Sequence, residues 1–222
     1  MAIVWPCQMS VETYAAAGRE VEVPRLDCPA CDRPMLRWSG YFRTVRSGAS
    51  DLRIFVARGR CRPCVVTHAL IPAFCLGHRL HGSEVIGEVI SEVVDGPGGV
   101  RPAARRREIV YETARGWLRR FRARAGEIAA RFAALTVELG GEAVTPVSDL
   151  SSYALEVIRA SFKAASALPG WAALPLWRFV AAVDGGRLLA TNTNSPYLVV
   201  GRRRFMPPVP RNDNENGGER GP

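Results

Sequence analysis

The chain has 222 residues, of which 47% are hydrophobic and 23% charged, enough for one or two domains with a hydrophobic core. Its formal net charge is +9, and Lys163 is the only lysine among 30 basic residues. The most apolar stretch, residues 164–183, is interrupted by Pro169, Gly170, Pro175 and Arg178, which excludes a membrane span of about 20 apolar residues.

The positive charge is concentrated in two segments. Residues 25–64 contain nine arginines and carry a net charge of +6, and residues 98–125 also contain nine and carry +7. The remainder of the chain has a net charge of −4. Such asymmetry is typical of proteins that bind a polyanion such as nucleic acid. The alternative is a solvated, arginine-rich surface without a ligand.

Residues 1–24 form a short N-terminal lead. Within it, residues 11–17 have the composition of one or two helical turns, ended by Gly18. The start of the chain lacks a basic segment followed by a long apolar one, so we expect no secretory signal and a cytoplasmic protein associated with the nucleoid. In a reducing cytosol, paired cysteines bind metal more often than they form disulfides.

Residues 25–82 contain two cysteine pairs, Cys28-x2-Cys31 and Cys61-x2-Cys64, separated by 29 residues. Between them, residues 37–45 and 52–58 have the composition of two strands, and residues 47–50 that of a turn. This hairpin would return the second pair to the first. Two such turns brought together complete a tetrahedron of sulfurs, which predicts a small antiparallel zinc ribbon.

Four thiolates leave no position for water, so the predicted metal is structural. One zinc ion is the expected cofactor, although four thiolates also suit iron. A segment of this size buries too little apolar surface to fold alone, and metal binding supplies the missing free energy. The remaining cysteines and histidines show no ligand spacing and are interpreted as structural, with His68 a candidate contact of the cluster: Cys7, Cys75, His68, His78 and His81.

Residues 83–139 are helical by period. Ser83 is a candidate N-cap, and Gly96-Pro97-Gly98-Gly99 ends the first helix. A short helix is expected over residues 100–107 and a longer one from Tyr111, which Gly126 is expected to divide. The all-helical region therefore begins here, and the fold class is α+β.

Residues 100–118 align with a helix-turn-helix. Ala104 supplies the small residue of the first helix, and Ile109 the apolar residue of the turn. The second helix has an apolar face for packing, made by Ala114, Trp117 and Leu118. The residues expected to contact DNA lie on its other side and in the first helix: Arg105, Arg106, Tyr111, Glu112, Arg115, Arg119 and Arg122.

Two positions depart from the usual pattern. The turn has Glu108 where glycine is common, and Arg107 occupies a position that is usually apolar. The competing interpretation is a surface helical hairpin with a solvated arginine-rich face. The coincidence of the basic segment with the packing pattern favours DNA binding.

Residues 140–193 are expected to form a C-terminal helical region. Residues 149–168 are amphipathic, with Asp149 as a candidate cap, and residues 174–183 form a short apolar helix. Residues 194–222 are rich in Pro, Asn, Gly and Arg and predict a disordered tail.

The sequence resembles the zinc-ribbon plus helix-turn-helix proteins of actinobacterial mobile elements, a domain-of-unknown-function family. Its N-terminal half is similar to the zinc-binding region of insertion-sequence transposases. The residues that carry the resemblance are Cys28-Pro29-Ala30-Cys31, Cys61-Arg62-Pro63-Cys64, Thr67-His68-Ala69-Leu70-Ile71-Pro72, residues 111–121 and residues 186–193. The resemblance implies a DNA-binding protein of a mobile genetic element.

The sequence gives no indication of an enzyme. Transposases with two catalytic metal ions need three acidic residues on a separate strand-rich fold, whereas the candidates Asp149, Glu156 and Asp184 lie in a region that is helical by period. Phosphate-binding, serine-hydrolase and zinc-protease motifs do not occur.

Three functions follow from these patterns. The first is a sequence-specific protein that binds double-stranded DNA as an accessory or regulatory factor, with a recombinase or transposase as a possible protein partner. The second is the DNA-binding part of a transposase whose catalytic part is separate. The third is a ribbon that binds RNA or bridges proteins, for which Trp38, Tyr41 and Phe42 are candidate stacking residues, with core packing as the alternative. The oligomeric state stays open.

Overall fold

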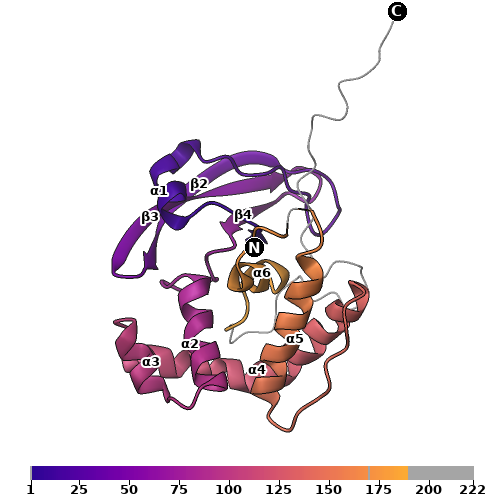
Figure 1. Cartoon of the computed structure of the whole chain (residues 1–222). Helices are drawn as coiled ribbons and strands as arrows, with labels where there is room; N and C mark the ends of the chain where they lie inside the picture. The colour runs from indigo at the N-terminus through magenta and orange to yellow at the C-terminus, as the bar shows by residue number, and fades with distance from the viewer. Residues whose placement is uncertain (1, 170, 190–222) are drawn as a thin grey trace, which may run out of the picture.

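The computed structural model describes residues 2–169 and 171–189, and within these ranges it contains a four-stranded sheet and six α-helices. The α+β class predicted from the sequence is therefore confirmed. The sheet forms one layer, and helices α2 to α5 lie together on one side of it (Figure 1). The predicted tail, residues 194–222, lies outside the described residues.

The sheet has the strand order β1-β4-β3-β2. Its longest strands form a hairpin of β2 (Leu36–Ser47), at one edge of the sheet, and β3 (Ser50–Cys61). The register of this hairpin runs from Ser47 opposite Ser50 to Leu36 opposite Arg60. The predicted strands and their turn are thus confirmed. β4 (Val66–Pro72) returns antiparallel to β3, and β1 (Ala2–Trp5) pairs with it in parallel. Neither β1 nor β4 was predicted from the sequence pattern.

One face of the sheet is covered by α1 (Val11–Ala17) and the 3-10 turn η1 (Gly18–Glu20). The Ser10 side chain accepts a hydrogen bond from the Thr13 amide and caps α1, and Gly18 ends it with φ at 52°. Tyr14 is fully buried, and its hydroxyl donates to the Phe55 carbonyl of β3 over 3.1 Å. The helix predicted over residues 11–17 therefore fixes the N-terminal lead to the hairpin.

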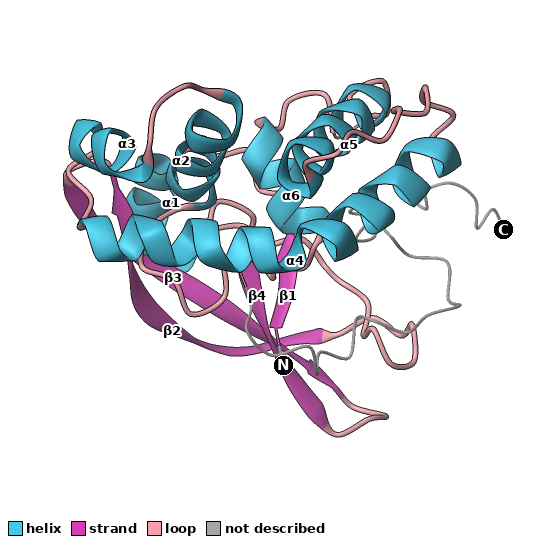
Figure 2. Cartoon of the chain, turned by 90° about the horizontal axis from the view of Figure 1, so that it is seen from below, coloured by secondary structure: helices cyan, strands magenta, loops and turns pink. Residues whose placement is uncertain are grey.

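The other helices are α2 (Ser83–Asp95), α3 (Val100–Arg106), α4 (Tyr111–Glu138), α5 (Leu150–Ala165) and α6 (Leu176–Val183). The short helix, the long helix and the amphipathic helix predicted in this region are all present. α2 packs against α3 and α4, and α4 packs along α5 (Figure 2). Asp149 caps α5 as predicted, by accepting from the Ser152 amide over 2.8 Å.

Two details of the helix prediction were wrong. Gly126 does not divide α4, which runs for 28 residues, because packing of Phe121, Ile128 and Phe132 on one face keeps it continuous. The N-cap of α2 is Gly82 and not Ser83. Ser83 is buried, and its hydroxyl donates to the Ala73 carbonyl over 2.9 Å, so it ties the helix to the segment after β4.

A single cluster of buried hydrophobic side chains runs from β1 through the sheet to α6. The buried guanidinium of Arg178 on α6 donates to the Cys7 carbonyl over 3.2 Å and binds Glu84 on α2 over 3.0 Å. A charge in this position is tolerated because each of these partners compensates its lost hydration. The ends of the described chain are thus packed together around one core.

Candidate metal centre and basic surfaces

The two cysteine pairs sit in two similar turns. In the first, the Cys31 and Asp32 amides donate to the Cys28 carbonyl over 3.3 and 2.8 Å. In the second, which joins β3 to β4, the Val65 amide donates to the Arg62 carbonyl over 3.3 Å. The residue after each pair has a left-handed backbone, with φ at 56° for Asp32 and 55° for Val65. Each turn therefore points two sulfurs to the same side.

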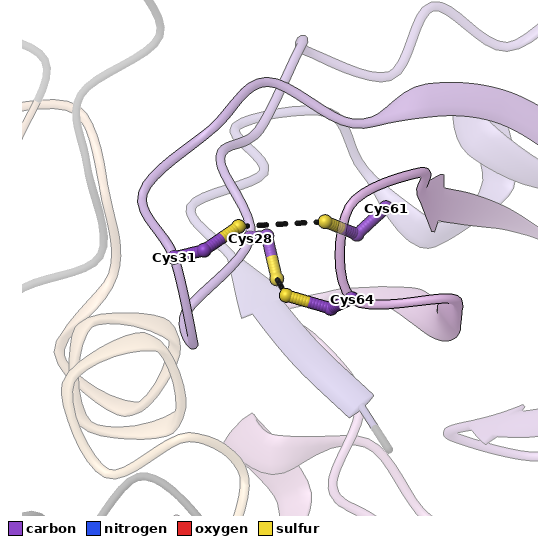
Figure 3. Close-up of side chains that lie close together, drawn as sticks. All are labelled: Cys28, Cys31, Cys61 and Cys64. Atoms are coloured by element: carbon purple, nitrogen blue, oxygen red, sulfur yellow. Dashed lines mark hydrogen bonds between the residues drawn. The ribbon is translucent and has the colours of Figure 1, made fainter.

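The four sulfur atoms of Cys28, Cys31, Cys61 and Cys64 all lie within 4.8 Å of one another (Figure 3). The distance from Cys31 to Cys61 is 3.5 Å, and that from Cys28 to Cys64 is 4.0 Å. A tetrahedron with metal–sulfur bonds of about 2.3 Å has edges of about 3.8 Å, whereas a disulfide needs about 2.0 Å. The arrangement fits one metal ion and not a pair of disulfides, as the spacing predicted.

The thiols differ in acidity. Burial raises the pKa of Cys28, and hydrogen bonding with Cys31 raises that of Cys64 to about 12. The backbone amide of Arg33 lowers the pKa of Cys31. Four adjacent sulfurs cannot all ionise unless a cation offsets their mutual repulsion, so a metal would take the place of their protons. Because all four donors come from the chain, the site has the character of a structural centre.

His68 on β4 lies beside the cluster and not in it. It is fully buried, and its Nε2 is 3.9 Å from the Cys28 sulfur. Burial lowers its pKa, so the ring is neutral near pH 7 and can donate one N–H to the sulfur.

Cys7 and Cys75 are buried away from the cluster, and burial raises the pKa of each thiol, to about 11 and about 12.

The segment after α2 has the packing that the sequence predicted. The apolar residues assigned to the turn and the second helix are buried, namely Ala104, Ile109, Ala114, Trp117 and Leu118. The Trp117 ring also meets His81 edge to face at 5.0 Å between centroids. At Glu108, where glycine was expected, φ is 53°, so the backbone has the conformation that glycine usually provides.

The arginines of this segment fall into two groups. Arg105, Arg115, Arg119 and Arg122 are exposed. Arg106 is also exposed, but it and the half-buried Arg107 both form ion pairs with Glu92 on α2. The other two predicted contacts are engaged locally: the Tyr111 ring lies under Arg101 at 4.7 Å, and Glu112 is 3.6 Å from Arg115.

The three acidic residues considered as catalytic have separate structural environments. Asp149 caps α5, Glu156 is exposed on α5, and Asp184 is buried against Arg131 of α4. In residues 2–169 and 171–189, the four cysteines are the only group of three or more candidate metal ligands. Within these ranges, Asp149, Glu156 and Asp184 therefore do not form a cluster that could hold a metal ion.

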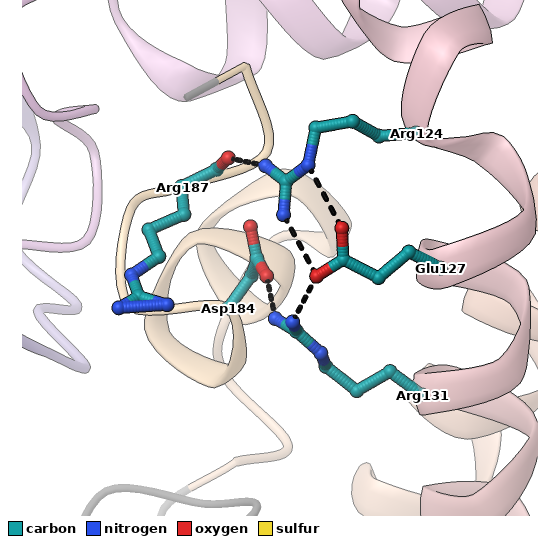
Figure 4. Close-up of polar contacts among 5 residues, drawn as sticks. All are labelled: Arg124, Glu127, Arg131, Asp184 and Arg187. Atoms are coloured by element: carbon teal, nitrogen blue, oxygen red, sulfur yellow. Dashed lines mark hydrogen bonds and ion pairs between the residues drawn. The ribbon is translucent and has the colours of Figure 1, made fainter. Parts of the chain in front are cut away.

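A partly buried ion-pair network joins α4 to the segment after α6 (Figure 4). Glu127 binds both Arg124 and Arg131, Arg131 also binds Asp184, and Arg124 donates to the Arg187 carbonyl. Glu127 is three residues after Arg124 and four before Arg131, so helical spacing in the sequence could have predicted both of its ion pairs. The contact with Asp184 spans 53 residues, and no local pattern could have revealed it.

Trp38 and Tyr41 on β2 are exposed, whereas Phe42 is half-buried and packs edge to face on Phe55 at 5.3 Å. Core packing therefore explains Phe42 but not the other two aromatic residues. No helix among the described residues is long and apolar enough to cross a membrane.

Residues 17–107 match the model of a family described as "Domain of unknown function (DUF6431)". The matched range contains the four cysteines, strands β2 to β4, and helices α2 and α3. No curated protein and no solved structure matches the chain.

Proposed function

We propose that this chain binds double-stranded DNA sequence-specifically through α3 and α4, around a core that a four-cysteine zinc centre stabilises. The observation that carries the proposal is the row of exposed arginines on the N-terminal half of α4. This helix follows a tight turn in which Glu108 has a left-handed backbone. In this function the chain binds DNA and catalyses no reaction.

The turn between α3 and α4 supports a helix-turn-helix. Four residues, 107–110, separate the helices. The left-handed Glu108 redirects the chain, and the Ile109 side chain, 7% exposed, anchors the turn in the core. The Ile109 amide donates to the Ala104 carbonyl over 2.9 Å, so the end of α3 is fixed to the turn. α2 packs against both helices and supplies the third helix common in such units.

The exposed face of α4 supports reading of bases. Arg115 and Arg119 are one helical turn apart and lie opposite the buried Trp117 and Phe121. A major groove admits an α-helix, and an arginine near its N-terminal end can bond guanine O6 and N7 together. Arg115 pairs with Glu112, but both side chains are exposed, so this ion pair is weak. Arg115 could therefore leave Glu112 and contact DNA at little cost.

The first helix supplies the candidate phosphate contacts. Arg105 is exposed, whereas Arg106 is paired with Glu92. Binding of Arg106 to a phosphate requires that this ion pair break, which makes Arg105 the stronger candidate of the two.

The cellular role follows from the resemblance to mobile-element proteins. We propose an accessory or regulatory factor that acts beside a recombinase or transposase, in the cytoplasm and on the nucleoid. The second candidate is the DNA-binding part of a transposase whose catalytic part is a separate protein. A neighbouring recombinase gene would favour the first.

The proposal is tested by selecting bound duplexes from a random pool, followed by titrations on the selected site and on unrelated DNA at several salt concentrations. Arg115→Ala should reduce binding to the selected site by about 5-fold to 150-fold, which corresponds to 1–3 kcal/mol, and affect unrelated DNA little. Arg105→Ala should weaken both and lower the salt slope by about 0.9. Arg159→Ala, which removes one exposed charge from α5, is the control.

Equal losses on both DNAs for Arg115→Ala would show that α4 provides only a basic surface. Failure to select any duplex would contradict sequence-specific binding altogether.

A further inference from the structure

The half of the β2–β3 hairpin that lies nearer its open end carries two exposed aromatic side chains and two half-buried arginines on one face, and one of these arginines, Arg58, donates to the Thr67 hydroxyl over 2.5 Å. In the register, Tyr41 lies opposite Val56, and Ser39 lies opposite Arg58. Because side chains alternate along a strand, Tyr41, Arg58 and Arg60 project from the same face. Trp38 joins them, since the Arg60 guanidinium lies over its ring at 4.4 Å.

A β-bulge gives Trp38 its position. The register shifts between Arg37 and Ser39, so Trp38 is the additional residue in β2. A bulge re-aims a side chain, and here it leaves Trp38 with 59% of its surface exposed. Tyr41 is 43% exposed. A large aromatic side chain so exposed adds little to the core, and β2 is at the edge of the sheet.

The charge of this surface complements a phosphate chain. Residues 25–64 carry a net charge of +6, and the acidic Asp51 is at the far end of the hairpin, where Arg46 binds it over 2.6 Å. Exposed aromatic rings interleaved with arginines are the usual platform for unpaired bases, whose faces stack on the rings while phosphates follow the cations. A duplex could not use these rings, because its bases are stacked on one another.

We propose that Trp38, Tyr41, Arg58 and Arg60 form a stacking surface for single-stranded DNA. The choice of DNA over RNA rests on the proposed function, but the surface itself does not.

β3 has 12 residues, which places its two ends about 35 Å apart along the strand. The Arg46 amide, near the turn of the hairpin, donates to the Leu80 carbonyl, and the adjacent His81 contacts Trp117 of α4. The N-terminal part of α4 therefore lies near the turn of the hairpin, whereas Trp38 and Arg60 lie near its open end. The stacking surface and the α4 surface are therefore separate.

The test uses the full-length, zinc-loaded protein and a fluorescent oligothymidylate of about 12 nucleotides, within the site size of single-strand binding folds. Trp38→Leu keeps the apolar bulk but removes the aromatic ring, and Trp38→Phe keeps a ring. Trp38→Leu should weaken binding by about 5-fold to 150-fold, the equivalent of 1–3 kcal/mol for one stacked base, while Trp38→Phe should stay near the wild type. Arg60→Ala should also weaken binding, and Arg159→Ala should not.

Melting temperature and metal content confirm that each variant is folded. Arg115→Ala should leave binding of the oligothymidylate unchanged, so that failure of the duplex proposal and failure of this one are distinguishable. Unchanged affinity in Trp38→Leu, or equal losses in Arg60→Ala and Arg159→Ala, would overturn the stacking surface. Tighter binding of oligouridylate than of oligothymidylate would overturn the assignment to DNA.

Discussion

Val65 has a backbone conformation that its side chain disfavours. It follows the second cysteine pair with φ at 55°, and it is 73% exposed. A β-branched residue crowds its own backbone in the left-handed region, at a cost of about 1–2 kcal/mol. The turn between Cys61 and Cys64 imposes this conformation, because it aims both sulfurs of the pair at the other pair. Asp32, at the matching position of the first turn, tolerates it better.

Val65→Gly should therefore stabilise the zinc-loaded protein. The relief of strain exceeds the additional chain entropy of glycine, and the net gain should be up to about 1 kcal/mol. Denaturant unfolding measures this difference. Val66→Gly, one residue along in β4, is the control and should destabilise, because glycine weakens a strand. A loss of stability in Val65→Gly would contradict the strain.

Asp184 predicts an unusual dependence of stability on pH. Its carboxyl is fully buried, and this burial raises its pKa from 3.8 to about 6, although Arg131, Arg124 and Arg187 act in the opposite direction. The folded protein then holds the proton more tightly than the unfolded chain between pH 3.8 and about 6. Stability contributed by this group therefore falls as pH rises through that window.

Asp184→Asn should remove this contribution, since the amide has the same shape and no charge. The measurement is the free energy of unfolding of both proteins from pH 4 to pH 7. Other groups also make stability depend on pH: Arg124 lowers the pKa of Glu127, and burial lowers the pKa values of His68 and His81. Their contributions are the same in both proteins and cancel in the comparison. The difference between the two proteins should grow as pH rises to about 6. A constant difference would mean that Asp184 stays ionised in the folded state.

At the scale of elements, the four-cysteine cluster lies at the open end of the hairpin. β3 ends at Cys61, and β4 begins two residues after Cys64, so the second turn is also the connection between two strands. The first turn precedes β2. Loss of the metal would leave four sulfurs in contact without charge compensation and would release both connections.

The purified protein should accordingly contain about one zinc ion per chain, and Cys61→Ser should lose it and unfold residues 25–75. Structural zinc contributes about 10–16 kcal/mol in small peptides, which exceeds the stability of most domains. Elemental analysis and circular dichroism before and after chelation measure both effects. Cys75→Ala is the control, because this buried thiol lies outside the cluster and the variant should keep the metal. A folded protein without metal would contradict the centre, and a red protein would indicate iron.

The elements that local patterns encode were predictable. The helical period of apolar residues predicted α2 to α5, and the paired cysteines predicted the four-cysteine cluster with the hairpin between the two pairs. β1 and β4 were missed because their pairing joins residues far apart, such as Ala2 with Ala69. Likewise, the role of Ser83 depends on the Ala73 carbonyl, which packing of the whole chain brings to it.

At the scale of the molecule, the hairpin with the four-cysteine cluster does not have a core of its own. Ile54 and Val56 on β3 are fully buried, and so is Tyr14 of α1, which bonds to the neighbouring Phe55. β4 has β1 on one side and β3 on the other. The contacts of Arg178 on α6 with Cys7 and Glu84 link both ends of the described chain to α2. Each part therefore covers apolar surface that belongs to another.

A fragment of residues 25–82 should consequently fail to fold even with zinc present. It would contain all four cysteines and the hairpin, but it would lack β1, α1 and the helices whose buried side chains belong to the same core as Ile54 and Val56. Large exposed apolar surfaces favour aggregation or a fluctuating chain. The measurement is the dispersion of amide signals in the NMR spectrum of the zinc-loaded fragment, with residues 1–189, which include the whole described core, as the control. A dispersed spectrum for residues 25–82 would show an autonomous ribbon, with the continuous core formed only when the helices dock on it.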